Sequence, residues 1–305
     1  MKYIIFRDEK ISKLSLGTVQ FGLDYGIANL DGKPSQKEIN KIIDYVIDNG
    51  VNCFDTAQAY GDAESILGDS LRQNNDLFII SKFGLELFRN KALLSILESL
   101  NNLKSKSMYA LLLHDSKILH EWKESDSIIV DDLLKTSKVK YFGVSIYSSE
   151  DFNLAIKNDK ITFIQIPFNL FDQRAIKEQW FKRAKKYNKL ILIRSIYLQG
   201  LLLMDRGKIP NELQKSIKYL KKVEELAKEL KISENELAIS FIDTVAQESL
   251  ILFGCENINQ AKENINNYKN IKKLSDFMIN KIKEEFKDID EDIYNPVRWL
   301  KWQNK

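Results

Sequence analysis

The sequence predicts an α/β fold, a (β/α)8 TIM barrel with an N-terminal β-hairpin and a C-terminal helical tail. From Leu16 onward, eight short apolar segments each precede a segment with helical periodicity. The apolar segments are rich in Ile, Leu and Val and do not alternate with polar residues, as expected for strands covered on both faces. No Pro- or Ser-rich linker interrupts the series. We therefore expect one barrel domain over residues 1–305.

The first residues predict the hairpin and the first barrel unit. Residues 1–6 and 11–14 flank the polar turn Arg7-Asp8-Glu9-Lys10. Residues 16–21 are expected to form the first main strand, which ends at Gly22. After a loop with several glycines, Pro34-Ser35 begins a helix with one apolar face that ends at Gly50.

The same pattern then recurs along the chain. Strands are expected at 52–55, 78–82, 109–114, 141–145, 163–168, 190–195 and 250–254. Helices are expected near 63–72, 91–103, 127–136, 150–156, 176–187, 212–230, 234–245 and 258–268, and a charged helical tail from about 272 leads to an aromatic stretch at 294–302. A doubly wound open sheet is the alternative fold, but it favours a Gly-x-Gly-x-x-Gly turn, which the chain lacks.

Composition limits the classes of function. The chain is 44% apolar and 29% charged, with a net charge of +3 from 46 basic and 43 acidic residues. This balance argues against a nucleic-acid partner, which requires clustered basic charge. No apolar run is long enough for a signal peptide or a membrane span, so we expect a cytoplasmic protein. Cys53 and Cys255 lie in apolar runs and are expected to be buried thiols, with no disulfide and no metal site.

Polar side chains stand at the ends of three successive expected strands. Asp55 ends the second strand and Tyr60 follows in its loop, Lys82 ends the third strand, and His114 ends the fourth. In a barrel the carboxyl ends of the strands meet at one mouth, where active sites form. We therefore expect these four side chains to converge.

This set of residues suits carbonyl reduction. A hydride added to a carbonyl carbon must be matched by a proton on the oxygen. Tyr60 is the expected acid, although a free phenol with a pKa of about 10 is a reluctant donor. The ammonium of Lys82 would lower that pKa, Asp55 would hold Lys82 charged and in place, and a neutral His114 would orient the carbonyl.

At these residues the chain resembles the aldo-keto reductases. The resemblance covers Leu16-Gly17-Thr18 to about Tyr268, and it rests on Phe54-Asp55-Thr56-Ala57-x-x-Tyr60-Gly61, Ser81-Lys82 and Leu113-His114. It implies a (β/α)8 barrel, a hairpin that closes the barrel floor, and NADPH bound without a Rossmann domain. It also implies the four catalytic roles given above.

The resemblance implies a set of cofactor residues as well. Ser145 and Gln165 match residues that contact the nicotinamide, but Ile146 replaces the usual Asn. Arg194 stands before Ser195, where family members usually place an aromatic ring against the nicotinamide. A planar guanidinium can also stack on a ring; the alternative is that Arg194 points to solvent.

The remaining cofactor residues belong to two segments. Leu198-Gln199-Gly200 resembles the loop over the pyrophosphate. The segment from Gly254 through Gln260 to Asn264 resembles the one that holds the adenosine and its 2′-phosphate at a helix N-terminus. Gly254 and Gln260 stand where many members have Lys and Arg. NADPH is the expected cofactor, and NADH is the alternative.

Substrate residues are expected in the loops. Gln20, Phe21 and Tyr25 follow the first strand, and Trp299 lies in the tail. The sequence Arg-Ser followed by Leu-Gln-Gly-Leu-Leu resembles bacterial members associated with sugar metabolism and surface-glycan synthesis. We therefore expect a small carbonyl substrate, a sugar or nucleotide sugar, and Arg194 would suit an anionic group on it.

Two other functions are compatible with these residues. One is a regulatory subunit that binds the cofactor with little turnover. The other is an epimerase or eliminase that uses the nicotinamide transiently on a sugar.

Overall fold

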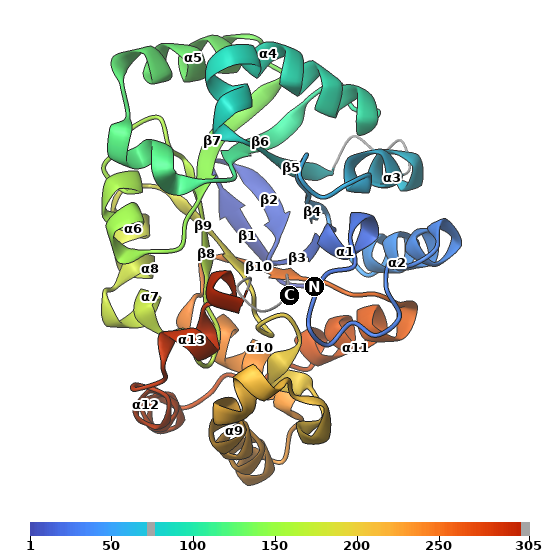
Figure 1. The fold of residues 1–305 in the computed structure, drawn as a ribbon, viewed down its shortest axis with the longest axis vertical. Coiled ribbons are helices and arrows are strands. Elements are labelled where there is room, and N and C mark those ends of the chain that lie inside the picture. Colours follow the sequence, from blue (N-terminus) through green and yellow to red (C-terminus); the bar gives the residue numbers. More distant parts are fainter. Residues whose placement is uncertain (72–76, 300–305) are drawn as a thin grey trace.

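Eight parallel strands close into a barrel in the computed structural model, which describes residues 1–71 and 77–299 (Figure 1). Each strand pairs with the next one in the chain, and β10 pairs with both β9 and β3. The barrel strands are β3 (Leu14–Gly17), β4 (Cys53–Asp55), β5 (Phe78–Phe83), β6 (Met108–Leu113), β7 (Val139–Ser145), β8 (Phe163–Pro167), β9 (Leu190–Arg194) and β10 (Leu250–Phe253). The predicted (β/α)8 barrel is confirmed, and the open-sheet alternative is wrong because β3 and β10 are paired and not edges.

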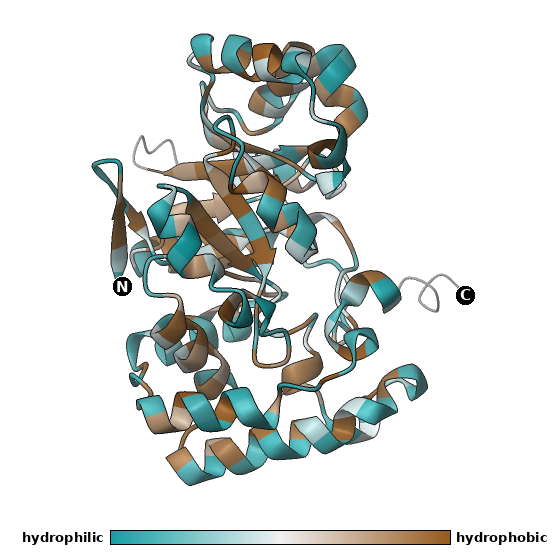
Figure 2. Cartoon of the chain, turned by 90° about the vertical axis from the view of Figure 1, so that its left-hand side faces the viewer, coloured by the Kyte–Doolittle hydropathy of each residue, from teal (hydrophilic) through white to brown (hydrophobic). Residues whose placement is uncertain are grey.

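Helices surround the barrel, and their apolar faces pack on the strands (Figures 1 and 2). They are α1 (Val19–Gly22), α2 (Gln36–Asp48), α3 (Ala63–Ser70), α4 (Leu85–Asn102), α5 (Glu124–Lys135), α6 (Ser149–Ala155), α7 (Arg174–Lys177), α8 (Trp180–Lys186), α9 (Ile217–Leu230), α10 (Glu234–Val245), α11 (Ile258–Lys269), α12 (Asp276–Glu285) and α13 (Glu291–Tyr294). Short 3-10 helices are η1 (Ser116–Glu121), η2 (Leu201–Leu203), η3 (Arg206–Lys208), η4 (Asn211–Ser216) and η5 (Pro296–Trp299). Within the described residues, none of the helices combines the length and apolar character that a membrane crossing requires.

An antiparallel hairpin, β1 (Tyr3–Phe6) and β2 (Glu9–Ser12), fills the amino end of the barrel. The Phe6 ring meets Tyr141 and Phe163 edge-on, with centroid distances of 5.9 and 5.7 Å. Ile11 is fully buried in the same apolar cluster. The hairpin expected at the barrel floor is therefore confirmed, and access to the barrel interior remains at the carboxyl ends of the strands.

The first barrel strand is shorter than predicted. It ends at Gly17 and not at Phe21, because the Thr18 N–H and hydroxyl both donate to the carbonyl of Asp55 and turn the chain there. The next four residues form α1, which buries Phe21 completely. The expected helix at 212–230 likewise begins as the 3-10 helix η4 and becomes α-helical only at Ile217.

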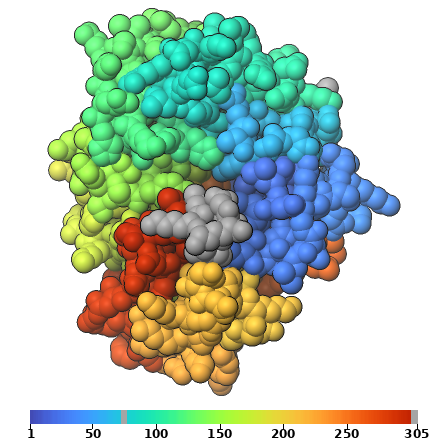
Figure 3. Space-filling model, in the orientation of Figure 1, coloured from blue at the N-terminus to red at the C-terminus, as the bar shows by residue number. Residues whose placement is uncertain are grey.

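The carboxyl-terminal segment crosses the face of the molecule that carries the mouth of the barrel. Figure 3 shows its residues (red) beside the segment near residue 210 (yellow). The two are joined by the Tyr219 hydroxyl, which donates to the carbonyl of Asp288 at 3.5 Å. The end of the predicted aromatic stretch, residues 300–302, lies outside the described residues.

Candidate active site

A buried ion pair forms the base of the site. Lys82 Nζ, at the end of β5, lies 2.6 Å from Asp55 Oδ2, at the end of β4. Their side chains are 0% and 6% exposed. Lys82 also donates to the carbonyl of Thr56 at 2.8 Å, and Gln165 Nε2 donates to Asp55 Oδ1 at 2.8 Å. Because these partners come from the carboxyl ends of β4, β5 and β8, on different sides of the barrel, the pair is held in one geometry.

The loop that carries Tyr60 is positioned by close contact with α1. Gly22 leaves no room for a side chain, since a Cβ there would lie 1.7 Å from the Tyr60 carbonyl oxygen. Gly61 has a φ of +59°, a conformation that favours glycine. The Gln58 amide anchors the other side of the loop by donating to Ser95 and Ser99 on α4. The phenol is therefore fixed between two elements.

Tyr60, Lys82 and His114 converge as the sequence predicts. Lys82 Nζ lies 5.0 Å from the centroid of the Tyr60 ring. The His114 ring meets Tyr60 edge-on at a centroid distance of 5.6 Å. Burial, together with the charges of Lys82 and Arg194, lowers the pKa of His114 to about 4, so the imidazole is neutral at pH 7.

The pKa of Tyr60 is governed mainly by its burial. Burial raises that pKa above its usual value, and Asp55 raises it further. The cation that opposes this shift is Arg194. Lys82 lies 5.0 Å from the centroid of the Tyr60 ring, and its charge is partly offset by Asp55 at 2.6 Å.

The carboxyl ends of the barrel strands open into a cavity of about 940 Å³. Most of the predicted site residues line it: Gln20, Tyr25, Asp55, Tyr60, His114, Ser145, Gln165, Arg194, Ser195, Gly200, Gly254, Gln260 and Asn264. One cavity thus contains the expected catalytic, nicotinamide and adenosine residues together. Its volume is in the range of small-molecule sites.

Four predicted residues do not line the cavity. Lys82 lies beneath it, where it supports Asp55 and faces the Tyr60 ring. Phe21 and Leu198 are fully buried in the apolar core. Trp299 is 1% exposed, and its indole Nε1 donates to the carbonyl of Asp292 at 2.9 Å, so it packs within the tail.

Arg194 points into the cavity, so the alternative that it faces bulk solvent is wrong. Its guanidinium lies 4.0 Å from the centroid of the Tyr147 ring and donates to the carbonyl of Ile146 at 3.1 Å. The Ile146 side chain is buried in the core. Where other members place an Asn side chain, this chain therefore presents only a backbone carbonyl.

Tyr147 is a cavity residue that the sequence analysis missed. It lines the cavity two residues after Ser145, at the end of a predicted strand, and that position was the available signal. Tyr197 was missed as well; its hydroxyl oxygen lies 2.7 Å from Asn235 Oδ1 and 2.5 Å from Asn264 Oδ1. No local pattern joins these three residues, because they come from different elements.

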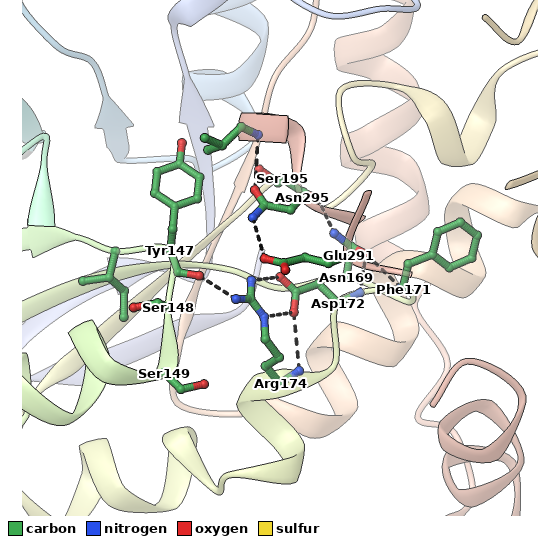
Figure 4. A network of polar contacts seen from close by, with 12 residues as sticks. Tyr147, Ser148, Ser149, Asn169, Phe171, Asp172, Arg174, Ser195, Glu291 and Asn295 are labelled. Carbon is green, nitrogen blue, oxygen red and sulfur yellow. Dashed lines mark hydrogen bonds and ion pairs between the residues drawn. The ribbon is translucent and has the colours of Figure 1, made fainter. Parts of the chain in front are cut away.

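A polar network behind the cavity holds the loops that carry Tyr147 and Ser195 (Figure 4). Arg174 donates to the Tyr147 carbonyl at 2.6 Å and pairs with Asp172. Asn169 Nδ2 donates to the Ser195 carbonyl at 3.0 Å. The Arg174 guanidinium also lies 5.2 Å from the Tyr294 ring, so the carboxyl-terminal segment supports the same wall.

Two loops meet across the cavity. A Cβ at Gly200 would lie 2.4 Å from Cβ of Ala28, so glycine allows the loop after β9 to touch the loop after β3. Gln20 packs against Gly254 in the same way, with Oε1 placed 2.5 Å from a Cβ at that position. Gln20 Oε1 is buried and has no hydrogen-bond partner among the described residues.

Fold and site together define a (β/α)8 oxidoreductase whose Tyr, Lys, Asp and His lie at the mouth of the barrel. The Aldo/keto reductase family model matches residues 13–286. The chain belongs to the aldo/keto reductase family.

The chain is also similar to known proteins. It is 24% identical over 316 residues to the uncharacterized oxidoreductase YqkF of Bacillus subtilis, covering 95% of this chain and 97% of YqkF. The fold matches the glycerol dehydrogenase AKR11B4 of Gluconobacter oxydans with a TM-score of 0.75 and 20% identity, over 97% and 96% of the two chains. An aldo/keto reductase of Klebsiella pneumoniae, solved with NADP and acetate, matches with a TM-score of 0.72 and 17% identity, over 93% and 95%.

Proposed function

We propose that the protein reduces an aldehyde or ketone with a nicotinamide dinucleotide, and that Tyr60 is the proton donor. The observation that carries this proposal is the convergence of Tyr60, His114 and the Lys82–Asp55 pair at one end of one cavity. The bound dinucleotide would supply the hydride. The chain itself must supply the proton, bind the carbonyl and exclude water.

Each side chain has a separate task. The Tyr60 hydroxyl gives its proton to the carbonyl oxygen as the hydride reaches the carbon. Neutral His114 donates a hydrogen bond to the same oxygen and orients it. The Lys82–Asp55 pair keeps a fixed dipole beneath the phenol, and Arg194 adds positive charge that favours the phenolate left behind.

NADPH is the cofactor that the comparison suggests, because the Klebsiella relative is solved with NADP, and NADH is the alternative. Ser145 and Gln165 would hold the nicotinamide amide, and Arg194 would lie against its ring. Gly200 lies in the loop that would cover the pyrophosphate. Asn264 would contact the adenosine.

We propose a sugar or nucleotide sugar as the substrate. Arg194 supports this proposal. Its guanidinium lines the cavity and is held there by the Tyr147 ring and the carbonyl of Ile146. A guanidinium placed in this way is available to a phosphate or carboxylate on the substrate. Tyr25 and Tyr147 line the same part of the cavity and offer ring faces to a sugar.

The test is turnover of a panel of keto-sugars, nucleotide sugars and small aldehydes, measured by absorbance at the nicotinamide band. Tyr60→Phe should lower kcat by about 100-fold or more, the range attributed to a general acid, and should leave cofactor affinity unchanged. Tyr187→Phe is the matched control, because Tyr187 is 48% exposed and outside the cavity lining. Unchanged turnover in Tyr60→Phe would show that another group donates the proton.

The same experiment separates the two other functions. A regulatory subunit would bind the dinucleotide tightly and turn over no member of the panel. An epimerase or eliminase would form product without net consumption of the nicotinamide cofactor.

A further inference from the structure

The adenosine end of the cavity carries carboxylates where a 2′-phosphate would need cations. We propose that this chain binds NADH at least as tightly as NADPH, because Glu256 and Glu38 disfavour the 2′-phosphate. The inference rests on the proposed function for the place of the cofactor, with its adenosine between Gly254 and Asn264. It goes further by assigning cofactor selectivity to two residues.

Glu256 stands at the beginning of the adenosine segment and lines the cavity. Its backbone N–H donates to Gln260 Oε1 at 2.8 Å, and Gln260 Nε2 donates to Glu256 Oε2 at 3.1 Å. Both ends of the Gln260 amide are therefore engaged with Glu256. A carboxylate there accepts a hydrogen bond from a ribose 2′-hydroxyl, whereas a 2′-phosphate calls for a cation.

The N-terminus of α11 already holds a carboxylate. Glu38, which reaches across from α2, accepts the backbone N–H of Ile258 at 2.9 Å. In the same first turn, the backbone N–H of Gln260 donates to the Asn257 side chain at 3.0 Å. Helix N-termini favour one anion in this position, and a phosphate would have to displace Glu38 or lie beside it.

The cation that many relatives have at position 254 does not fit here. The Gln20 amide fills the space over Gly254, since a Cβ would lie 2.5 Å from Oε1 and 2.7 Å from Nε2. A lysine side chain at this position would have to displace Gln20.

The nearby cations are already paired or lie outside the cavity. Arg206 lines it, but its Nη2 donates to both oxygens of Glu234, at 2.8 and 2.9 Å. Lys41 lies 3.0 Å from the Glu38 carboxylate. The positive charge of Lys262 helps to lower the pKa of Glu38, but Lys262 does not line the cavity. Glu38 does not line the cavity either, but it lies at the N-terminus of α11. A 2′-phosphate would therefore add a dianion beside Glu256 and near Glu38, with no unpaired cation among the described lining residues at this end.

Direct binding tests the inference. Dissociation constants of NADH and NADPH are measured by calorimetry and by nicotinamide fluorescence at low ionic strength. We expect the NADH constant to be equal to or lower than that of NADPH. We also expect Glu256→Gln and Glu38→Gln each to tighten NADPH by roughly tenfold relative to NADH, as removal of like-charge repulsion predicts. Glu248→Gln, which removes an exposed carboxylate paired with Lys185, should change neither constant.

Binding of cofactor fragments shows whether the selectivity arises at the 2′-phosphate. The wild type should bind 5′-AMP at least as well as 2′,5′-ADP, and Glu256→Gln should reverse that order. NADPH binding more than threefold tighter than NADH in the wild type overturns the inference and leaves the proposed reductase intact. An unchanged NADPH to NADH ratio in both glutamine variants also overturns it. Failure of both dinucleotides to bind overturns the proposed function as well.

Discussion

Lys82 Nζ lies 2.6 Å from Asp55 Oδ2, and the two side chains are 0% and 6% exposed. Taking two charges out of water is costly, and each charge is tolerated only because the other is present. The pair therefore ties the chemistry of the site to the stability of the barrel.

Asp55→Asn should destabilise the fold by about 3–5 kcal/mol, the cost of leaving one member of a buried pair unpaired. Burial already lowers the pKa of Lys82, and loss of Asp55 should lower it further. Urea unfolding measures the change. Asp132→Asn breaks the exposed pair with Lys135 and should cost less than about 1 kcal/mol. Equal effects of the two substitutions would contradict the prediction.

The two histidines should give opposite pH dependences of stability. His114 has an ordinary pKa of 6.5 and a folded pKa of about 4. The unfolded chain therefore binds the extra proton first, and the contribution of neutral His114 is lost as pH falls from 6.5 through 4, by about 2–3 kcal/mol. Relative to His114→Gln, the wild type should lose stability over this range.

His120 is the control for that experiment. Its hydrogen bond to Asp151 raises its pKa. Its contribution is therefore present below pH 6.5 and lost as pH rises through the folded pKa. Relative to His120→Gln, the wild type should gain stability on acidification. Urea unfolding at several pH values measures both, and the same sign for both histidines would refute the assignment.

Arg194→Met should slow the reaction. It removes the cation that opposes the raised pKa of Tyr60, so the phenol becomes a weaker acid. We expect kcat to fall by about tenfold at pH 7, a part of the general-acid contribution. Arg194→Lys should keep more of the rate than Met, because it keeps the charge. Arg183→Met removes a guanidinium that lies 4.9 Å from the Phe152 ring, outside the cavity lining, and should have no effect on kcat.

Gly22→Ala should damage both stability and activity. The new Cβ would meet the Tyr60 carbonyl at 1.7 Å, and relief of this clash must move α1 or the catalytic loop. We expect a loss of about 3 kcal/mol or more and a large fall in kcat. Gly84→Ala, where a Cβ meets nothing within 4 Å, should cost less than about 1 kcal/mol. Thermal unfolding and the carbonyl assay measure the pair of variants.

Local patterns in the sequence were sufficient for the barrel and the catalytic centre. Apolar runs predict buried strands. In a closed barrel, a polar residue at the carboxyl end of such a strand lies at the mouth of the barrel. Asp55, Lys82 and His114 could therefore be placed together although 27 residues separate the first two. Tyr60 followed from the loop between them.

Contacts between distant elements could not be predicted in the same way. The carboxylate of Glu38 reaches α11 across 220 residues of sequence. The role of Arg194 in setting the pKa of Tyr60 depends on the partial neutralisation of Lys82 by Asp55, which is a matter of distances. Trp299 was expected among the substrate residues of the loops and tail, but its indole Nε1 donates to the carbonyl of Asp292 within the tail.

The hairpin at the floor of the barrel provides an attachment point far from the chemistry. Its turn residues Arg7 and Asp8 are exposed at the amino ends of the strands, and the reactants enter at the carboxyl ends. Both native thiols, Cys53 and Cys255, are buried, and burial raises their pKa, so they are poor nucleophiles. A cysteine introduced as Asp8→Cys would thus be the one reactive thiol. Enzyme coupled to a surface through it would be uniformly oriented, with every mouth open to the solution.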